Sequence, residues 1–160
     1  RAFEISFNMT TTFPIALPAE YGYVILAYVL SSFVNFWHGM RVGGARKVHG
    51  VQYPAEYQIT LKDGKVDQSN VFNCFQRSHQ NFLENYFMVM GMMFIAGFKY
   101  PVYAAAAGTI WLVGRVMYAL GYQTGDPKKR MRGGIAYVGL LGLLVMNVIT
   151  ALSMLGYVKL

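Results

Sequence analysis

Four long apolar stretches dominate the chain, and most of its charged residues fall between them. The first stretch runs from Tyr23 to Met40 and the last from Gly133 to Val158, and neither contains an Asp, Glu, Lys or Arg. The stretch over residues 71–98 contains two charges, and the stretch over residues 101–125 contains one. Each stretch has roughly the 20 residues that an α-helix needs to cross about 30 Å of hydrocarbon. The pattern therefore predicts an all-α, integral membrane four-helix bundle.

The segments between these stretches define the expected boundaries. We expect helices at about residues 22–42, 71–98, 101–123 and 133–158, in one membrane domain over residues 21–160. Residues 1–20 form an N-terminal extension without the basic start and short apolar core of a signal peptide. In the long connection between the first two helices, Lys62-Asp63-Gly64-Lys65 predicts a tight turn with strand-like residues on either side.

Composition supports a membrane location over a soluble bundle of buried helices. Of the 160 residues, 55% are hydrophobic and only 13% are charged, whereas about a quarter of the residues of a soluble domain are charged. A soluble bundle would also need a polar face on each helix, and the first, third and fourth stretches have none. The single cysteine, Cys74, excludes an internal disulfide and fits no metal-binding pattern.

The basic residues predict an orientation in the membrane. Nine of them lie in the connections after the first and third stretches: Arg41, Arg46, Lys47, Lys62, Lys65, Lys128, Lys129, Arg130 and Arg132. Loops enriched in Lys and Arg remain on the cytoplasmic side, so both termini are expected on the opposite side. The net charge of +7 is then an orientation signal that can also serve an anionic ligand. It does not indicate nucleic acid as a partner.

Polar side chains follow one face of the second predicted helix. Arg77, Asn81, Glu84 and Asn85 are spaced i, i+4, i+7 and i+8, and Gln80 borders this stripe. A charged side chain at membrane depth costs at least about 2.5 kcal/mol and normally faces a cavity or the bundle interior. The stripe therefore predicts a ligand site. The alternative is that the two charges only neutralise each other, which a separation of two turns should allow only in part.

The third predicted helix carries a second polar edge. Arg115, Tyr118 and Tyr122 are spaced i, i+3 and i+7, although tyrosines at a helix end are also typical of an interfacial aromatic belt. The basic run over residues 128–132 follows directly. Together these features predict a cationic, amide-rich cleft for a small anionic, peptide-like molecule beside a lipophilic one. The three histidines have no ligand spacing that would predict a metal site.

Two motifs resemble the MAPEG family of membrane-associated proteins in eicosanoid and glutathione metabolism. The first is Phe72-Asn73-Cys74-Phe75-Gln76-Arg77-Ser78-His79-Gln80-Asn81-Phe82-Leu83-Glu84, and the second is Gly121-Tyr122-Gln123-Thr124-Gly125-Asp126-Pro127. Weaker likeness begins at Glu20-Tyr21-Gly22, continues through Ala45-Arg46-Lys47 and Tyr53-Pro54, and includes Val113-Gly114-Arg115-Val116. Within the family, the sequence is most similar to the microsomal glutathione S-transferase type 3 group.

The resemblance implies a homotrimer of four-helix protomers that binds glutathione between subunits near the cytosolic surface. By position in the motifs, the glutathione-binding residues would be Arg46, Arg77, Asn81, Glu84, Tyr118 and Tyr122. A basic residue at the start of the fourth helix would face the glutathione sulfur. Arg130 is the residue we choose for this catalytic role, with Lys129 as the alternative.

The activity implied is that of a glutathione transferase, including conjugation like that of leukotriene C synthase, or of a glutathione-dependent peroxidase. The second substrate would be a lipophilic electrophile or lipid hydroperoxide from the bilayer, and glutathione would be the co-substrate, without a metal. The endoplasmic reticulum is the expected membrane, with a mitochondrial membrane as the alternative. The alternatives to an enzyme are a non-catalytic lipid-binding scaffold and an accessory subunit of a larger membrane complex.

Two positions depart from the family pattern. Relatives commonly have a proline three residues after the glutamate, where this chain has Phe87, so the second helix is expected to lack a bend there. Asn85 stands where some relatives have a tyrosine, and no contact can be transferred to it.

Overall fold

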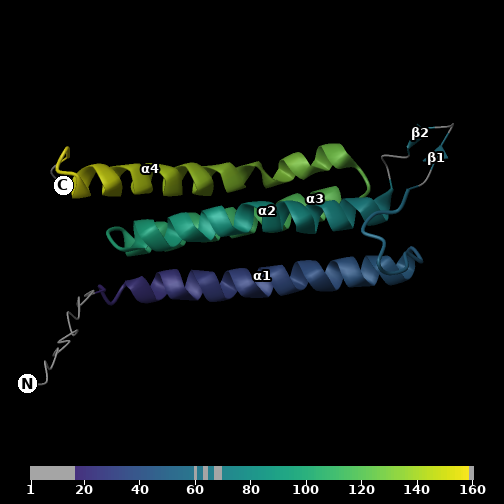
Figure 1. The fold of residues 1–160 in the computed structure, drawn as a ribbon, viewed down its shortest axis with the longest axis horizontal. Helices are drawn as coiled ribbons and strands as arrows, with labels where there is room; N and C mark the ends of the chain where they lie inside the picture. The colour runs from purple at the N-terminus through teal and green to yellow at the C-terminus, as the bar shows by residue number, and fades with distance from the viewer. Residues whose placement is uncertain (1–16, 60, 63–64, 67–69, 159–160) are drawn as a thin grey trace, which may run out of the picture.

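Four long helices lie side by side along one axis in the computed structural model, which describes residues 17–59, 61–62, 65–66 and 70–158 (Figure 1). The helices are α1 (Tyr21–Val48), α2 (Val71–Gly97), α3 (Pro101–Tyr122) and α4 (Ala136–Met154), and a 3₁₀ helix, η1 (Pro127–Ile135), leads directly into α4. Most of the predicted N-terminal extension lies outside the described residues. Each of the four apolar stretches of the sequence corresponds to one of these long helices.

Three of the helix ends differ from the sequence prediction by three or more residues, and one of them is the end of α4, at Met154 and not at residue 158. The first helix continues through the basic residues to Val48, beyond the predicted end at residue 42. Arg and Lys are good helix formers, so the end of an apolar stretch does not end the helix. The α-helical part of the fourth element begins at Ala136, since the residues before it form the tighter turns of η1.

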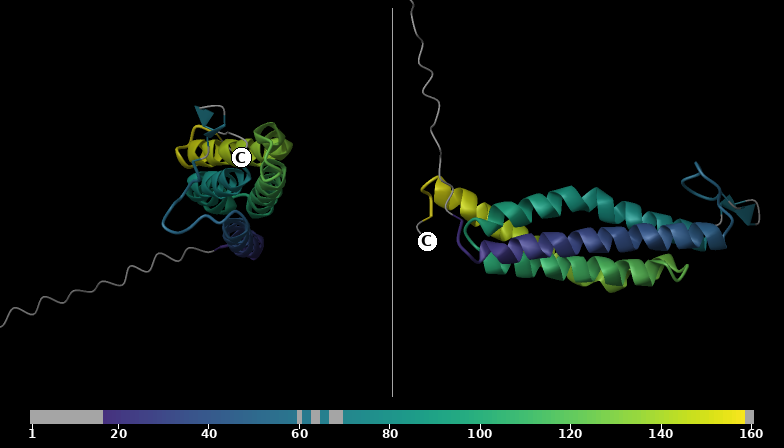
Figure 2. Two further views of the ribbon diagram at one scale, coloured as in Figure 1. Left: turned by 90° about the vertical axis from the view of Figure 1, so that its right-hand side faces the viewer. Right: turned by 90° about the horizontal axis from the view of Figure 1, so that it is seen from below.

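A small antiparallel hairpin extends from one end of the bundle (Figures 1 and 2). It pairs β1 (Leu61–Lys62) with β2 (Lys65–Val66), in the register Leu61 with Val66 and Lys62 with Lys65. This pairing agrees with the turn predicted there, although residues 63–64 at its tip lie outside the described residues. The α1–α2 and α3–η1 connections share this end of the bundle, which we call the hairpin end (Figure 1).

Within the described part of the chain, three helices are long and apolar enough to cross a membrane. They are α1, α3 and the continuous segment from Pro127 to Met154. Helix α2 has 27 residues, which at 1.5 Å per residue gives about 40 Å, so its length suffices. Its polar stripe makes it less apolar than the others, and its membrane crossing therefore remains a prediction. The chain is an integral membrane protein on the evidence of the other three.

The core contains side chains from all four helices. Val24, Phe82 and Leu143 are fully buried, and Trp111 is 2% exposed. The Phe82 and Trp111 rings lie 5.4 Å apart, which joins α2 to α3 at the level of the polar stripe. By contrast, many apolar side chains on the outer faces of α1 and α4 are exposed, as expected of surfaces that contact lipid.

Helices α3 and α4 approach closely at two glycines, at Gly114 against the start of α4 and at Gly139 in its interior. A Cβ atom on Gly139 would lie 2.8 Å from the backbone nitrogen of Trp111 and closer still to the carbonyl oxygen of Ala107. Both are backbone atoms of α3, which, unlike the end of a flexible side chain, cannot rotate away from an added methyl group. One turn further along α4, a Cβ on Gly142 would meet only the Ala107 side chain, at an ordinary 3.7 Å. Gly139 therefore permits the close approach of the two helices in the interior of α4, whereas Gly142 is not required for it.

We expect the substitution Gly139→Ala to lower the stability of the protein by about 1–3 kcal/mol, because the added methyl forces the helices apart. Gly142→Ala is the matched control and should be neutral or slightly stabilising, since alanine is the better helix former. Thermal unfolding of both variants in the same detergent measures the difference. Equal midpoints for the two variants would contradict the close approach at Gly139.

Candidate functional site

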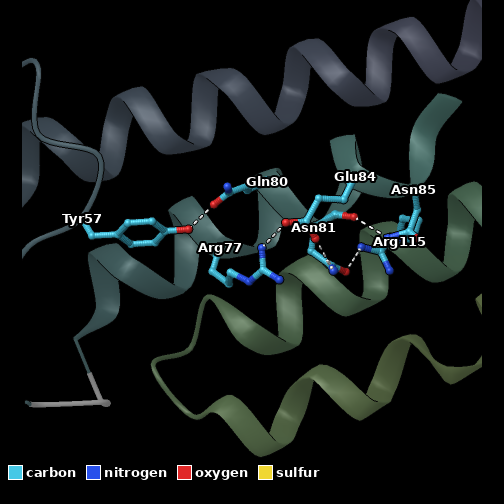
Figure 3. A network of polar contacts seen from close by, with 7 residues as sticks. All are labelled: Tyr57, Arg77, Gln80, Asn81, Glu84, Asn85 and Arg115. Carbon is cyan, nitrogen blue, oxygen red and sulfur yellow. Dashed lines mark hydrogen bonds and ion pairs between the residues drawn. The ribbon is translucent and has the colours of Figure 1, made fainter.

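The polar stripe of α2 forms a connected set of contacts. Asn70 caps the helix, since its side chain accepts a hydrogen bond from the Asn73 backbone N–H at 3.1 Å. Further along, Arg77 Nη1 and Glu84 Oε1 form an ion pair at 2.6 Å, and Asn81 Nδ2 donates to Glu84 Oε2 at 3.1 Å (Figure 3). The two charges thus pair more closely than their spacing predicted. The Arg77 and Glu84 side chains are still 40% and 45% exposed.

Arg115 joins α3 to this stripe. Its Nη2 donates to Asn81 Oδ1 at 2.5 Å, and its guanidinium carbon lies 4.5 Å from the centre of the Tyr118 ring. The residue is only 8% exposed, and its Nε atom has no hydrogen-bond partner among the described residues. The two polar edges predicted from the sequence therefore face each other and meet at Asn81.

Helix η1 packs against the end of α3 and presents Arg130. Glycines permit the close approach: a Cβ on Gly121 would collide with the carbonyl oxygen of Lys129, and one on Gly133 would lie 2.5 Å from the Tyr118 Cβ. Lys129 Nζ lies 3.9 Å from Asp126 Oδ2. Arg130 points to the other side, with its guanidinium carbon 5.8 Å from the centre of the Tyr122 ring.

Between α2, α3, η1 and α4 lies a cavity of about 370 Å³. It is polar on the side of α2 and α3 and largely apolar toward α4. The residues that line it are Asn81, Asn85, Trp111, Arg115, Tyr118, Arg130, Met131, Gly133, Gly134, Ala136, Tyr137 and Leu140. The cavity therefore offers two guanidinium groups and two amides beside an apolar wall, which suits an anionic group joined to, or placed next to, a lipophilic one.

The structure places all the predicted site residues except Arg46 at this cavity or next to it. Asn81, Tyr118 and Arg130 line the cavity. Arg77 and Glu84 adjoin it through Asn81. Tyr122 adjoins it through Tyr118, whose ring lies 5.6 Å away in an edge-to-face arrangement.

Arg46 is not brought to this cavity. It is buried, its Nη1 donates to the carbonyl oxygens of Ala55 at 2.8 Å and Val51 at 3.4 Å, and its guanidinium lies over the Tyr53 and Phe72 rings. Arg46 therefore fastens the connection after α1. The position in a motif gave no indication of this role, since the partners of Arg46 are backbone atoms of the connection.

Gln123 is a structural residue that the sequence analysis missed. Arg41 Nε donates to its Oε1 at 2.5 Å, and its Nε2 donates to Ser78 Oγ at 3.0 Å. It therefore joins α1, α2 and the end of α3, next to Tyr122. A single glutamine after a helix carries no local signal for such a role, because its partners lie 82 and 45 residues away.

The fold and the cavity define an integral membrane protein of four long helices with a cationic, amide-rich pocket at the hairpin end. The described residues contain no cluster of His, Cys, Asp and Glu that could hold a metal ion. Residues 24–152 match the MAPEG family, and the chain belongs to that family. It is 36% identical over 95 residues to an uncharacterized protein of Synechocystis sp., sll1147, in a match that covers 59% of this chain and 61% of that protein.

The contact between Asn81 and Arg115 gives a direct test of the site. We expect Asn81→Leu to destabilise the protein by about 1.5–3 kcal/mol, because it removes a hydrogen bond to a buried charged group. Asn85→Leu is the matched control: Asn85 lines the same cavity but donates to the Asn81 backbone oxygen of its own helix. Chemical or thermal unfolding in detergent measures both. A larger loss in the Asn85 variant would contradict the bridging role of Asn81.

Proposed function

We propose that this protein is a membrane-bound glutathione transferase with glutathione-dependent peroxidase activity as an accompanying reaction, closest in activity to the microsomal glutathione S-transferase type 3 group. The observation that carries the proposal is the cavity in which Arg115 and Arg130 face amides on one side and apolar residues on the other. The family to which the chain belongs includes glutathione transferases, and a small anionic thiol beside a lipid substrate fits this division of the cavity.

The stripe on α2 would bind the glutathione backbone. Arg77 can form charge-assisted hydrogen bonds with a carboxylate, and Glu84 can accept from the ammonium group of the γ-glutamyl residue. The ion pair between these two side chains is partly exposed, so a ligand with both charges can exchange with it without leaving either side chain unpaired. Asn81 would position the tripeptide between these charges and the cavity.

The reaction requires a thiolate, and a cation beside the sulfur supplies the stabilisation. A thiol with a pKa of about 8.5 is only a few per cent ionised at neutral pH, and lowering that pKa by about two units needs about 2.7 kcal/mol. We assign this role to Arg130, because it lines the cavity whereas Lys129 pairs with Asp126. The thiolate would then attack an electrophilic carbon to form a thioether, while the leaving group departs or an epoxide ring opens and its oxygen takes up a proton from water. With a lipid hydroperoxide, the thiolate would attack one peroxide oxygen and break the O–O bond, which gives glutathione sulfenic acid and, after protonation, the lipid alcohol. A second glutathione would convert the sulfenic acid to glutathione disulfide and water.

The second feature of the proposal is a homotrimer with the hairpin end toward the cytosol, where basic loops are retained. The charged face of α2 is partly exposed in the protomer, and on the same helix Phe87 is 88% exposed. Leaving these charges in contact with lipid would cost several kcal/mol, so a neighbouring protomer is the expected cover. Glutathione and a lipophilic substrate from the bilayer would then meet between subunits, in the endoplasmic reticulum or a mitochondrial membrane.

The oligomeric state can be measured directly. Native mass spectrometry of protein released from detergent should show a mass of three 18.0 kDa chains. The variant Arg77→Ala should form the trimer less readily if this charged face is buried between protomers. A purely monomeric wild type under mild release would contradict the assembly.

The central test is the appearance of thiolate absorbance when glutathione is added to the purified protein near neutral pH. In Arg130→Ala the thiolate signal and turnover should fall by up to about a hundredfold, because the pKa of the bound glutathione thiol is no longer lowered by two units. Part of the activity should return at higher pH, where the thiol ionises without the arginine. Lys129→Ala is the matched control and should remain active, because Lys129 is not one of the described residues that line the cavity.

The outcomes separate the candidate functions. Loss of turnover in Lys129→Ala with an active Arg130→Ala would shift the activating residue by one position. Normal activity in both variants would place activation elsewhere. Bound glutathione with no thiolate and no turnover in the wild type would favour a lipid-binding scaffold or an accessory subunit, for which the apolar wall of the cavity is the relevant surface.

A further inference from the structure

The connection between α1 and α2 is fastened to the first turns of α2. The backbone N–H of Gln58 donates to Asn73 Oδ1 at 2.8 Å, and Asn73 Nδ2 donates back to the Gln58 carbonyl oxygen at 2.7 Å. Asn70 Nδ2 donates to Gln58 Oε1 at 3.0 Å. Together with the contacts of Arg46 to the carbonyl oxygens of residues 51 and 55, these bonds fix residues 51–59 against the bundle.

Tyr57 reaches from this connection to the polar stripe. Its side chain points along α2 and its hydroxyl donates to Gln80 Oε1, beside Arg77 (Figure 3). Gln80 lies three residues after Arg77 and four before Glu84. Burial raises the pKa of Tyr57, against the opposing effect of Arg77, so the phenol keeps its proton at neutral pH and acts as a hydrogen-bond donor.

A phenol and a guanidinium side by side form a pair of donors for one carboxylate. The hydroxyl has one proton, which it gives to a neutral amide oxygen in the structure. A ligand carboxylate is a stronger acceptor, because a hydrogen bond to an ionised group is roughly twice as strong as a neutral one. A carboxylate held by Arg77 would therefore compete with Gln80 for the Tyr57 hydroxyl.

We propose that Tyr57 is a specificity-determining residue of the ligand site, which donates to the same ligand carboxylate as Arg77. This proposal rests on the proposed function, since glutathione is the carboxylate-bearing ligand. It adds a residue from outside α2, α3 and η1 to the binding site. Because the connection is fixed by its own contacts, the donor is in place before the ligand binds.

The experiment uses Tyr57→Phe, which keeps the ring and removes only the hydroxyl. We expect the glutathione Kd measured by calorimetry to rise about tenfold, as for a lost hydrogen bond to a charged group, with little change in kcat at saturating glutathione. The matched control is Tyr53→Phe, in the same connection, where the ring covers Arg46 and is 79% exposed. Its Kd should equal that of the wild type.

Two glutathione analogues, each with one carboxylate replaced by a carboxamide, distinguish ligand binding from a structural role. Amidation of the carboxylate that Tyr57 contacts should weaken binding in both proteins, but the factor should be about tenfold smaller in Tyr57→Phe than in the wild type. Amidation of the other carboxylate should raise the Kd by the same factor in both proteins. An equal weakening of glutathione and both analogues in Tyr57→Phe would overturn the proposal by showing a structural effect, as would an unchanged Kd. A wild type that does not bind glutathione would contradict the proposed function itself, and this inference with it.

Discussion

The site depends on the need to satisfy a cation inside an apolar bundle. Arg115 is 8% exposed, and a guanidinium without partners in such surroundings would be very costly. Its hydrogen bond to Asn81 Oδ1 and its position over the Tyr118 ring supply part of the stabilisation that the charge requires. Asn81 in turn donates to Glu84, which holds Arg77. One chain of contacts therefore extends from the buried cation to the exposed ion pair.

Two cationic side chains line the cavity. Arg115 comes from α3, and Arg130 lines the same space from η1. Two positive charges at one cavity favour the binding of an anion between them, since both make the electrostatic potential inside the cavity more positive. The apolar wall strengthens that interaction by excluding water. The cations at the cavity thus come from α3 and η1, while the polar stripe of α2 contributes the amides of Asn81 and Asn85.

Close packing at the hairpin end decides which basic residue of η1 reaches the cavity. The glycines of α3 and η1 let the backbone of η1 lie directly on α3, and Asp126 caps its first turn by accepting from the Lys128 N–H at 3.0 Å. With this backbone fixed, neighbouring residues in η1 must point in different directions, so Arg130 reaches the cavity while Lys129 turns to Asp126. A sequence motif cannot distinguish two adjacent basic residues, but the direction of the helix can.

The sequence by itself determined the helices, the membrane location, the family resemblance and the faces of α2 and α3, because each depends on local periodicity, on composition or on short motifs. The spacing of Arg77, Asn81 and Glu84 placed them on one face, and the fold keeps them there. Only the tertiary structure decided the contact of Asn81 with Arg115, the burial of Arg46 under its own connection, and the reach of Tyr57 to Gln80. These contacts join residues from different elements, and their geometry follows from how the elements pack, which no periodicity in a single segment encodes.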